Sequence, residues 1–466
     1  MTNWDEGFDV VVVGSGAAGL SAAIEAARAG VSVVVFEKMK APGGNTRISD
    51  GSLAAPGTPL QKALGGEDSP DLLVEDMCCA GLGLNHRHLV RIVAERAAEA
   101  VAWTEELGVE YLHRLDQFGG HSAARALTSW NHSGADITRA QRATLNEMGV
   151  EIRTRCLLTR LHRDQDGAVR GVEIRQGHTP GEEDSGTLRY ARAGRGVILA
   201  TGGFARDVRF RSLQDPGLDA AIQSTNHRGA TAEGLLAALS IGALPVHLSW
   251  IQTGPWGCPD ERGYGHGASF ASYAVYPEGI LVDPATGTRI VNEWADRRER
   301  ADALFRVGHP CLGLIDARGA ERAADSLRRC LKRGTVRAFE SLAGLAAAYD
   351  VPRASLEATV RAYNQLVARG EPDRFGKPLD QRQAQPLEEF PFYAIRLWPK
   401  VHYTPGGVGI DARARVLDLR GRPIPGLFAA GEVTGGVHGA ARLGSCALTD
   451  CIVFGRIAGQ QAAAGR

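Results

Sequence analysis

The fold of this chain is decided by residues 9–38, which read DVVVVGSGAAGLSAAIEAARAGVSVVVFEK. Residues 10–13 are typical of a buried strand, residues 20–29 of an alanine-rich helix, and residues 31–36 of a second buried strand. The first strand and the helix are joined by GSGAAG, whose glycines suit a tight turn, a close approach of a pyrophosphate to the backbone, and close packing of helix on strand. The stretch therefore predicts a dinucleotide-binding unit of an α/β fold.

The same stretch supplies candidate cofactor contacts. The helix N-terminus offers unpaired N–H groups and the positive end of a dipole to phosphates. Glu37 ends the second strand, where a carboxylate can accept a hydrogen bond from a ribose hydroxyl. A glycine-rich loop follows, and its backbone N–H groups can reach phosphate or flavin atoms. The predicted cofactor-binding residues of this region are Gly14, Gly16, Ala17, Ala18, Gly19, Glu37, Lys38, Gly43, Gly44, Asn45, Thr46 and Gly51.

Length and charge limit the function classes. A chain of 466 residues is too long for one compact core, so two domains are expected. The 53 acidic and 53 basic residues balance without a block of like charge, which argues against a nucleic-acid partner or a membrane surface. The eight cysteines include no CxxC, so no metal site is expected. The chain enters its first strand without a signal segment and has no long apolar window, so we expect a cytoplasmic protein.

The remaining chain returns twice to the cofactor. Residues 71–107 have a helical period, and residues 150–161, 169–175 and 186–192 are typical of a β-meander. A strand over 196–200 runs into an ATGG turn, and the segment 425–432 again joins a strand to a glycine turn. We therefore predict an α/β fold: a Rossmann-like domain that binds a flavin nucleotide, with a parallel sheet and the meander, split into residues 1–247 and 402–466. The segment 248–401, rich in Pro, Gly and aromatic loops and poor in long apolar strands, is predicted to be an inserted α+β capping domain.

Six segments carry a resemblance to a known family. They are GGN at 43–45, ATGGF at 200–204, STN at 224–226, RIVNE at 289–293, HYTPGGV at 402–408 and GGVHGAARLG at 435–444. Together they are similar to the flavoproteins of fumarate reductases and succinate dehydrogenases, most of all to the soluble flavocytochrome-type fumarate reductases. The resemblance implies bound FAD. Asn45 stands where membrane-bound relatives attach FAD covalently through a histidine, so we expect non-covalent FAD. The haem domain of the flavocytochrome type is not in this sequence, so we expect an electron donor or acceptor of unknown identity.

The resemblance also implies site residues. His402 and Arg442 match a histidine and an arginine that bind one substrate carboxylate, for which a guanidinium fork is well suited. Arg297 matches the arginine that delivers a proton. The remaining predicted cofactor contacts are Ala200, Thr201, Gly202, Tyr403, Glu432, Ser445, Ala447 and Leu448.

Two family motifs are missing. The His-Pro-Thr motif that serves a second carboxylate reads TGPW at 253–256, and the Thr-Glu pair with its following arginine reads Ala271-Ser272 and Tyr276. An unpaired second carboxylate would be desolvated at a cost of several kcal/mol. We therefore expect a small-molecule substrate with one carboxylate or carbonyl beside an activated C=C bond, and Tyr276 is a candidate proton donor.

Two alternatives stay open at this point. The same residues serve a desaturating dehydrogenase or oxidase of the ketosteroid-dehydrogenase kind, because the reaction geometry is reversible. An electron-transfer flavoprotein subunit without substrate chemistry is a third reading, although electron transfer needs neither His402 nor Arg442.

Overall fold

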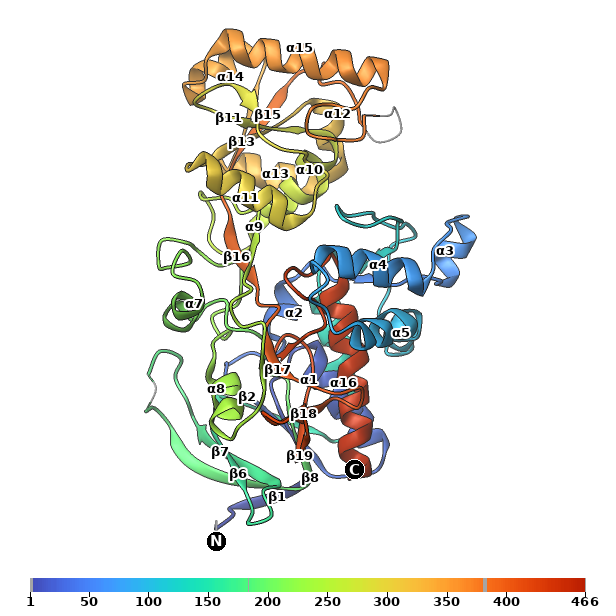
Figure 1. Cartoon of the computed structure of the whole chain (residues 1–466), viewed down its shortest axis with the longest axis vertical. Helices are drawn as coiled ribbons and strands as arrows, with labels where there is room; N and C mark the ends of the chain where they lie inside the picture. The colour runs from blue at the N-terminus through green and yellow to red at the C-terminus, as the bar shows by residue number, and fades with distance from the viewer. Residues whose placement is uncertain (1–2, 183, 380–383, 466) are drawn as a thin grey trace. The chain divides into compact units, whose positions relative to one another are not determined.

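The computed structural model describes residues 3–182, 184–379 and 384–465, and these form two compact units (Figure 1). The first unit contains the residues up to Asp219, His227–Gln252 and the chain from Tyr403 onward. The second unit contains Ala220–Asn226 and Thr253–His402. No helix in the described ranges combines the length and the apolar character needed to cross a membrane.

The first unit is built on a largely parallel sheet. Its order is β18-β19-β8-β1-β2-β5, and every pair from β19 to β5 is parallel. The strands β6 and β7 extend it as an antiparallel meander onto β8. The bounds are β1 Glu6–Val13, β2 Val33–Glu37, β5 Glu151–Thr154, β6 Cys156–Arg163, β7 Val169–Gln176, β8 Thr187–Leu199, β18 Arg415–Leu417 and β19 Pro423–Ala429.

Two helices pack tightly together in this unit, α1 (Ala17–Arg28) and α16 (Cys446–Ala464) (Figure 1). A Cβ on Gly455 would lie 2.4 Å from the carbonyl oxygen of Ala18, so glycine is required where the two backbones meet. The other elements are α2 Gly44–Ile48, α3 Pro59–Ala63, α4 Pro70–Ala80, α5 Arg87–Glu106, α6 Ala135–Glu147, α7 Val208–Gln214, α8 Glu233–Ser240, and the short strands β3 Ser52–Ala54, β4 Ala126–Thr128, β9 Pro245–Val246, β17 Gly407–Gly409 and β20 Thr434–Gly435.

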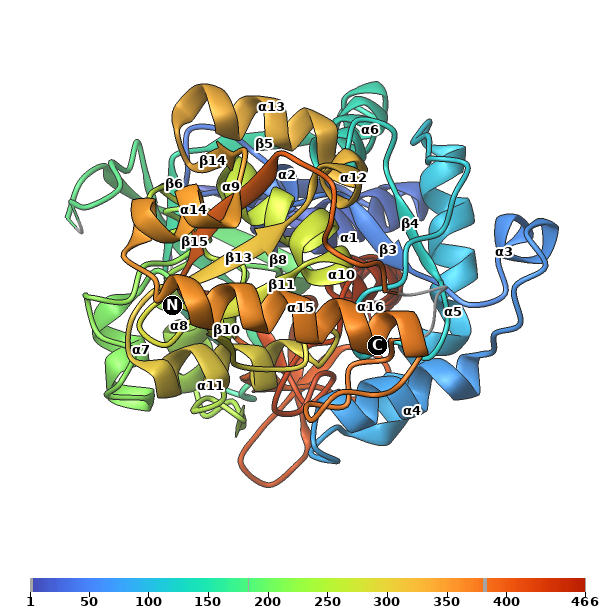
Figure 2. The same cartoon turned by 90° about the horizontal axis from the view of Figure 1, so that it is seen from above.

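The second unit has an antiparallel sheet, β12-β11-β13-β15-β14, with an apolar core on each face. Alternate residues of β11 and β13 enter the two cores, as the period of a strand requires. The helix α15 packs in one of these cores (Figure 2). The strands are β10 Gln252–Gly254, β11 Ile280–Asp283, β12 Thr288–Arg289, β13 Cys311–Ile315, β14 Val336–Phe339, β15 Phe392–Leu397 and β16 Lys400–Tyr403, which pairs with β10. The helices are α9 Gly265–Phe270, α10 Tyr276–Glu278, α11 Arg297–Val307, α12 Ala317–Ala320, α13 Ala324–Arg333, α14 Leu342–Tyr349 and α15 Arg353–Arg369, with a π-helix over Ala271–Val275 and a 3-10 helix over Glu321–Ala323.

The predicted α/β fold, with its parallel sheet and meander, is confirmed, and three details differ. The two strands expected over 186–192 and 196–200 are the single strand β8, whose first half pairs with β7 and second half with β1. The helical segment 71–107 is two helices, because Leu82 and Gly83 take positive φ between them. The segment 248–401 holds a five-stranded sheet despite its few long apolar runs, since its strands are short.

Candidate functional site

The glycine-rich turn after β1 has two kinds of glycine. Gly14 has φ +105° and a Cβ there would lie 2.2 Å from the carbonyl oxygen of Ala200, while a Cβ on Gly19 would lie 1.9 Å from that of Gly14. These two glycines are required by the packing of the chain itself. A Cβ on Gly16 would approach only the Thr46 hydroxyl oxygen, at 3.6 Å, and Gly16 itself has no side chain to cap the helix that begins at Ala17. The lack of a side chain at Gly16 therefore keeps this helix N-terminus open to a phosphate, which fits a dinucleotide.

Glu37 is already engaged with the turn. Its carboxylate accepts hydrogen bonds from the Ser15 N–H at 3.1 Å, from the Ser15 hydroxyl at 2.5 Å and from the Met39 N–H at 2.8 Å. The predicted hydrogen bond from a ribose hydroxyl to Glu37 would therefore use a carboxylate lone pair that these three bonds leave free. Lys38 forms an ion pair with Glu233 at 2.9 Å.

The loop after β2 is tied to the first helix. The Ala17 N–H donates to the Thr46 hydroxyl at 3.0 Å, and Ala18 is buried one residue further along α1. Gly43 and Gly44 both take positive φ, which explains the choice of glycine. Gly51 also has positive φ, and a Cβ there would meet the Ser129 hydroxyl at 2.4 Å, so packing accounts for this residue.

The ATGG turn lies against the first glycine turn. The Ala200 N–H donates to the Val13 carbonyl at 2.8 Å, which places the end of β8 beside the end of β1. Gly202 has φ +75°, and a Cβ there would have no atom within 4 Å, whereas a Cβ on Gly234 would meet the Thr201 side chain at 2.4 Å. The turn between Ala200 and Gly202 therefore has a packed side at Thr201 and an open side at Gly202.

A buried carboxylate, Glu432, follows β19. It accepts hydrogen bonds from the Thr404 N–H at 3.0 Å and from the side chain of Asn45, and burial raises its pKa. Asn45 in turn accepts a hydrogen bond from the His227 N–H at 2.7 Å. The predicted cofactor residues Asn45 and Glu432 are thus brought together, although they lie at opposite ends of the chain.

Arg442 lies in the same unit and is 6% exposed. Its guanidinium carbon stands 4.8 Å from the ring centroid of Tyr403, and its carbonyl accepts a hydrogen bond from the Gln252 side chain at 3.0 Å. The Tyr403 ring packs edge-on against His438, whose Nε2 lies 3.3 Å from a carboxylate oxygen of Asp450. The ring of Tyr403 therefore forms an aromatic platform for the Arg442 guanidinium.

The helix α16 begins four residues after Arg442, at Cys446. Ser445 has φ +58°, it caps the helix without its side chain, and its carbonyl accepts a hydrogen bond from the Ala54 N–H at 3.1 Å. The first turn contains Cys446, Ala447 and Leu448, and N–H groups of a first turn have no intrahelical acceptor. The end of this helix can therefore stabilise negative charge on a flavin.

His402 belongs to the second unit. Its Nδ1 lies 2.8 Å from the Thr225 hydroxyl oxygen, which orients the ring. Its ring also meets the indole of Trp256 edge-on, with the centroids 5.1 Å apart. The Arg297 guanidinium stacks over the same indole, 4.6 Å from its centroid. The indole therefore contacts both the predicted carboxylate ligand and the predicted proton donor.

Trp256 also fills the space of an absent side chain. A Cβ built on Gly254 would lie 3.0 Å from Cε2 and 3.2 Å from Nε1 of the indole, so a side chain at 254 would force the indole to shift by a few tenths of an ångström. The indole is 4% exposed, and in the described part of the chain its Nε1 has no hydrogen-bond partner.

The three arginines at the start of α11 point to different partners. Asp296 caps this helix, so Arg297 is its first residue. Arg298, which is partly exposed, forms an ion pair with Asp302 at 3.5 Å. Arg300 is buried, and its guanidinium lies 4.2 Å from the ring centroid of Tyr276.

Tyr276 lies in a core of the second unit. Burial raises its pKa, and within the described residues its hydroxyl has no hydrogen-bond partner. A proton donor needs a hydrogen-bonded path for its own reprotonation, so the surroundings of Tyr276 do not favour it in that role.

Sequence reasoning missed two of these contributors. Thr225 belongs to the STN segment that carries the family resemblance, but nothing local pairs it with His402, 177 residues further on. In the sequence Trp256 is only a departure from a motif, and its contacts with His402 and Arg297 depend on tertiary packing.

Comparison with known proteins places the chain in a family. Residues 9–448 match the family model described as FAD binding domain, and the chain belongs to this family. The chain is 43% identical over 462 residues to the acrylate reductase flavoprotein subunit of Shewanella woodyi (strain ATCC 51908 / MS32), which is 98% of this chain and 91% of that protein.

Two solved structures extend the comparison. A flavocytochrome c3 fumarate reductase in its open conformation matches with a TM-score of 0.80 and 33% identity, covering 99% of this chain and 79% of that one. The 3-ketosteroid-Δ4-(5α)-dehydrogenase from Rhodococcus jostii RHA1, in complex with 4-androstene-3,17-dione, matches with a TM-score of 0.76 and 26% identity, covering 99% and 98%. The predicted resemblance to fumarate reductase flavoproteins is confirmed. The chain is an FAD-dependent oxidoreductase acting on CH–CH groups.

Proposed function

We propose that this protein reduces the activated C=C bond of a small 2-enoic acid with a single carboxylate. The observation that carries the proposal is the indole of Trp256 in the space above Gly254. Aligning the proline of the family's His-Pro-Thr motif with Pro255 puts Gly254 in place of the histidine and Trp256 in place of the threonine. An aromatic surface thus replaces a cationic ligand, and a second carboxylate would meet no cation there. The similarity to an acrylate reductase flavoprotein subunit supports the same substrate class.

His402 and Arg442 are the proposed ligands of the carboxylate. Thr225 orients His402 through Nδ1, and Tyr403 supports the Arg442 guanidinium. Cationic and hydrogen-bonding groups on the carboxylate draw electron density from the double bond and prepare the β-carbon for hydride. When bound and reduced, FAD supplies that hydride.

Arg297 is the proposed donor of the proton to the α-carbon. Its guanidinium is held against the face of Trp256, and a cation–π contact stabilises the charged form and fixes its plane. An arginine is a weak acid, so the proton leaves as the hydride arrives and the guanidinium regains a proton from another donor before the next turnover. Hydride on the β-carbon and a proton on the α-carbon together give the saturated acid.

We propose that FAD is bound without a covalent bond, in the first unit. Asn45 offers no nucleophile, and its side chain is engaged with Glu432 and the His227 N–H. We further propose that residues 1–247 and 402–466 act as the FAD-binding domain and residues 248–401 as the capping domain. Reducing equivalents are proposed to come from a separate electron donor, and the cytoplasmic location stays a prediction.

Anaerobic stopped-flow spectroscopy of the FAD-loaded protein tests the proposal. The reduced enzyme is mixed with acrylate, crotonate or fumarate, and reoxidation is followed at the flavin band. We expect the monocarboxylates to reoxidise the flavin at least about tenfold faster than fumarate, since an unpaired carboxylate costs more than 1.4 kcal/mol. Equal rates with fumarate would contradict the single-carboxylate assignment.

A variant sharpens this test. Gly254→His combined with Trp256→Thr restores the family motif, and we expect it to raise the rate ratio of fumarate to acrylate. Trp256→Phe is the matched control, because it keeps an aromatic wall and should keep the wild-type ratio. If the double variant and the control give the same ratio, the wall does not select the substrate.

Desaturation is the second candidate, favoured by the similarity to a ketosteroid dehydrogenase structure. The same instrument separates the two directions. Bleaching of the oxidised flavin by saturated acids or ketones, together with no reoxidation by enoates, would establish the dehydrogenase and refute the reductase.

A further inference from the structure

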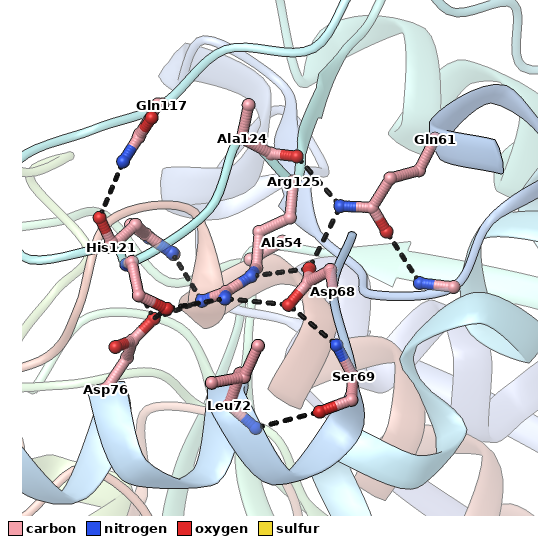
Figure 3. Close-up of polar contacts among 12 residues, drawn as sticks. Ala54, Gln61, Asp68, Ser69, Leu72, Asp76, Gln117, His121, Ala124 and Arg125 are labelled. Carbon is pink, nitrogen blue, oxygen red and sulfur yellow. Dashed lines mark hydrogen bonds and ion pairs between the residues drawn. The ribbon is translucent and has the colours of Figure 1, made fainter. Parts of the chain in front are cut away.

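A buried arginine lies at the centre of a polar cluster in the first unit (Figure 3). Arg125 is fully buried, and it binds Asp68 with two parallel hydrogen bonds of 2.8 Å, from Nε and Nη2. It also donates to Asp76, to the Ser122 hydroxyl at 3.2 Å and to Nδ1 of His121 at 3.1 Å. All five guanidinium N–H donors thus have acceptors.

These bonds decide the tautomer of His121. A guanidinium can only donate, so Nδ1 of His121 must accept and carries no proton. The proton therefore sits on Nε2, which lies 2.9 Å from the carbonyl oxygen of Gly444 and donates to it.

Gly444 lies in the segment that joins Arg442 to the helix α16. Three successive anchors hold this segment: Gln252 at the carbonyl of Arg442, His121 at the carbonyl of Gly444, and the Ala54 N–H at the carbonyl of Ser445. The His121 bond is the middle anchor. A shift of the Gly444 peptide would move both Arg442 and the start of α16.

We propose that His121, held in its Nε2–H tautomer by Arg125, is a positioning residue that sets the Arg442–Ser445 segment and thereby the affinity for the substrate carboxylate. The proposal rests on the role given above to Arg442. His121 acts through the Gly444 carbonyl and needs no contact with the substrate.

The test compares His121→Gln with His121→Met in the full-length, FAD-loaded enzyme. Glutamine keeps an N–H donor near the position of Nε2, whereas methionine fills the space without one. Affinity is measured with propionate, a saturated acid that does not react with the oxidised enzyme in the proposed direction, from its perturbation of the oxidised flavin spectrum. We expect a Kd about tenfold weaker for His121→Met, the value of one ordinary hydrogen bond, and a Kd within about twofold of wild type for His121→Gln.

Two further readouts separate positioning from mere structural support. FAD content and melting temperature should match between the two variants, and KM for acrylate should rise more than kcat falls in His121→Met. The ¹⁵N spectrum of the wild-type imidazole should show a bare Nδ1 and a protonated Nε2. Substitution of Arg125 is a poor test, because it leaves Asp68 and Asp76 without their cation and destabilises the fold.

The outcomes are distinguishable. A wild-type enzyme that neither binds propionate nor reduces acrylate refutes the proposed function. If the wild-type enzyme binds propionate and His121→Met binds it equally well, the positioning role alone is refuted. The positioning role is also refuted if His121→Met loses FAD or stability while its FAD-loaded fraction binds propionate with the normal Kd. A protonated Nδ1 in the ¹⁵N spectrum also overturns the proposal.

Discussion

The hydrogen bond between Thr225 and His402 gives the most direct test of the carboxylate site. The Thr225 hydroxyl oxygen lies 2.8 Å from Nδ1 of His402 and 3.5 Å from the carbonyl oxygen of Val401. The hydroxyl proton can therefore point to Val401 while its oxygen accepts from Nδ1. Thr225→Val keeps the shape of the side chain and removes this acceptor.

The size of the effect follows from the burial of the pair. Thr225 is only 3% exposed, so water does not readily replace the lost partner. A buried polar group left unsatisfied costs about 1–3 kcal/mol. If this cost is expressed in the transition state, kcat/KM for acrylate falls by about 5- to 150-fold.

The assay is steady-state reduction of acrylate under anaerobic conditions, with Thr225→Ser as the control that keeps the hydroxyl. We expect Thr225→Ser to stay within about threefold of wild type, since its hydroxyl can still accept from Nδ1. A Thr225→Val enzyme within twofold of wild type would refute the reasoning. Equal losses in both variants would refute it too, because they would point to packing of the methyl group.

Three other predictions follow from the described contacts. Gly16→Ala should leave the melting temperature of the apoprotein near wild type and weaken FAD binding, whereas Gly19→Ala should prevent folding because its Cβ would lie 1.9 Å from the Gly14 carbonyl oxygen. Fluorescence titration with FAD and thermal melts check both variants. A normal FAD affinity in Gly16→Ala would contradict the phosphate role. Tyr276→Phe should keep kcat within about twofold of wild type, since the lost hydroxyl has no partner among the described residues. Arg297→Met should lower kcat at least about a hundredfold. Equal losses of kcat in the two variants would restore Tyr276 as a candidate proton donor. Burial alone would raise the pKa of Glu293, but Lys377 and Arg289 hold it below its usual value near 4.5. The ionised carboxylate therefore stabilises the fold above that pH, and this stabilisation is lost as the pH falls below it. The melting temperature should drop between about pH 5 and pH 3, and Glu293→Gln should show a flatter dependence; an equally steep dependence would show that the ion pair is not the cause.

Much of the fold was predictable because the decisive signals are local. The glycines at 14 and 19 are required by backbone atoms a few residues away or at the end of the adjoining strand, and the β1–α1–β2 unit has regular hydrophobic periods. The division of β8 into two strands was wrong, because the strand runs on through Gly194 with a register shift against β1, and ladders with β7 and β1 hold the residues before and after it.

The candidate site was predictable only as a set of residue types. The motifs selected His402, Arg442 and Arg297, but residue spacing in the run of arginines could not separate Arg297 from Arg300. The structure separates them through the rings that they cover, Trp256 and Tyr276.

The sequence by itself determined the dinucleotide unit, the α/β class and the candidate ligands, because these follow from local backbone requirements and from motifs of a few residues. Only the tertiary structure decided that an indole fills the space above Gly254 and contacts both His402 and Arg297. It also decided that Arg125 fixes the tautomer of His121, whose Nε2 reaches a carbonyl 323 residues away. Contacts of this kind join segments that no period or motif relates, and they form only when the packed sheets and helices bring those segments within a few ångströms of each other.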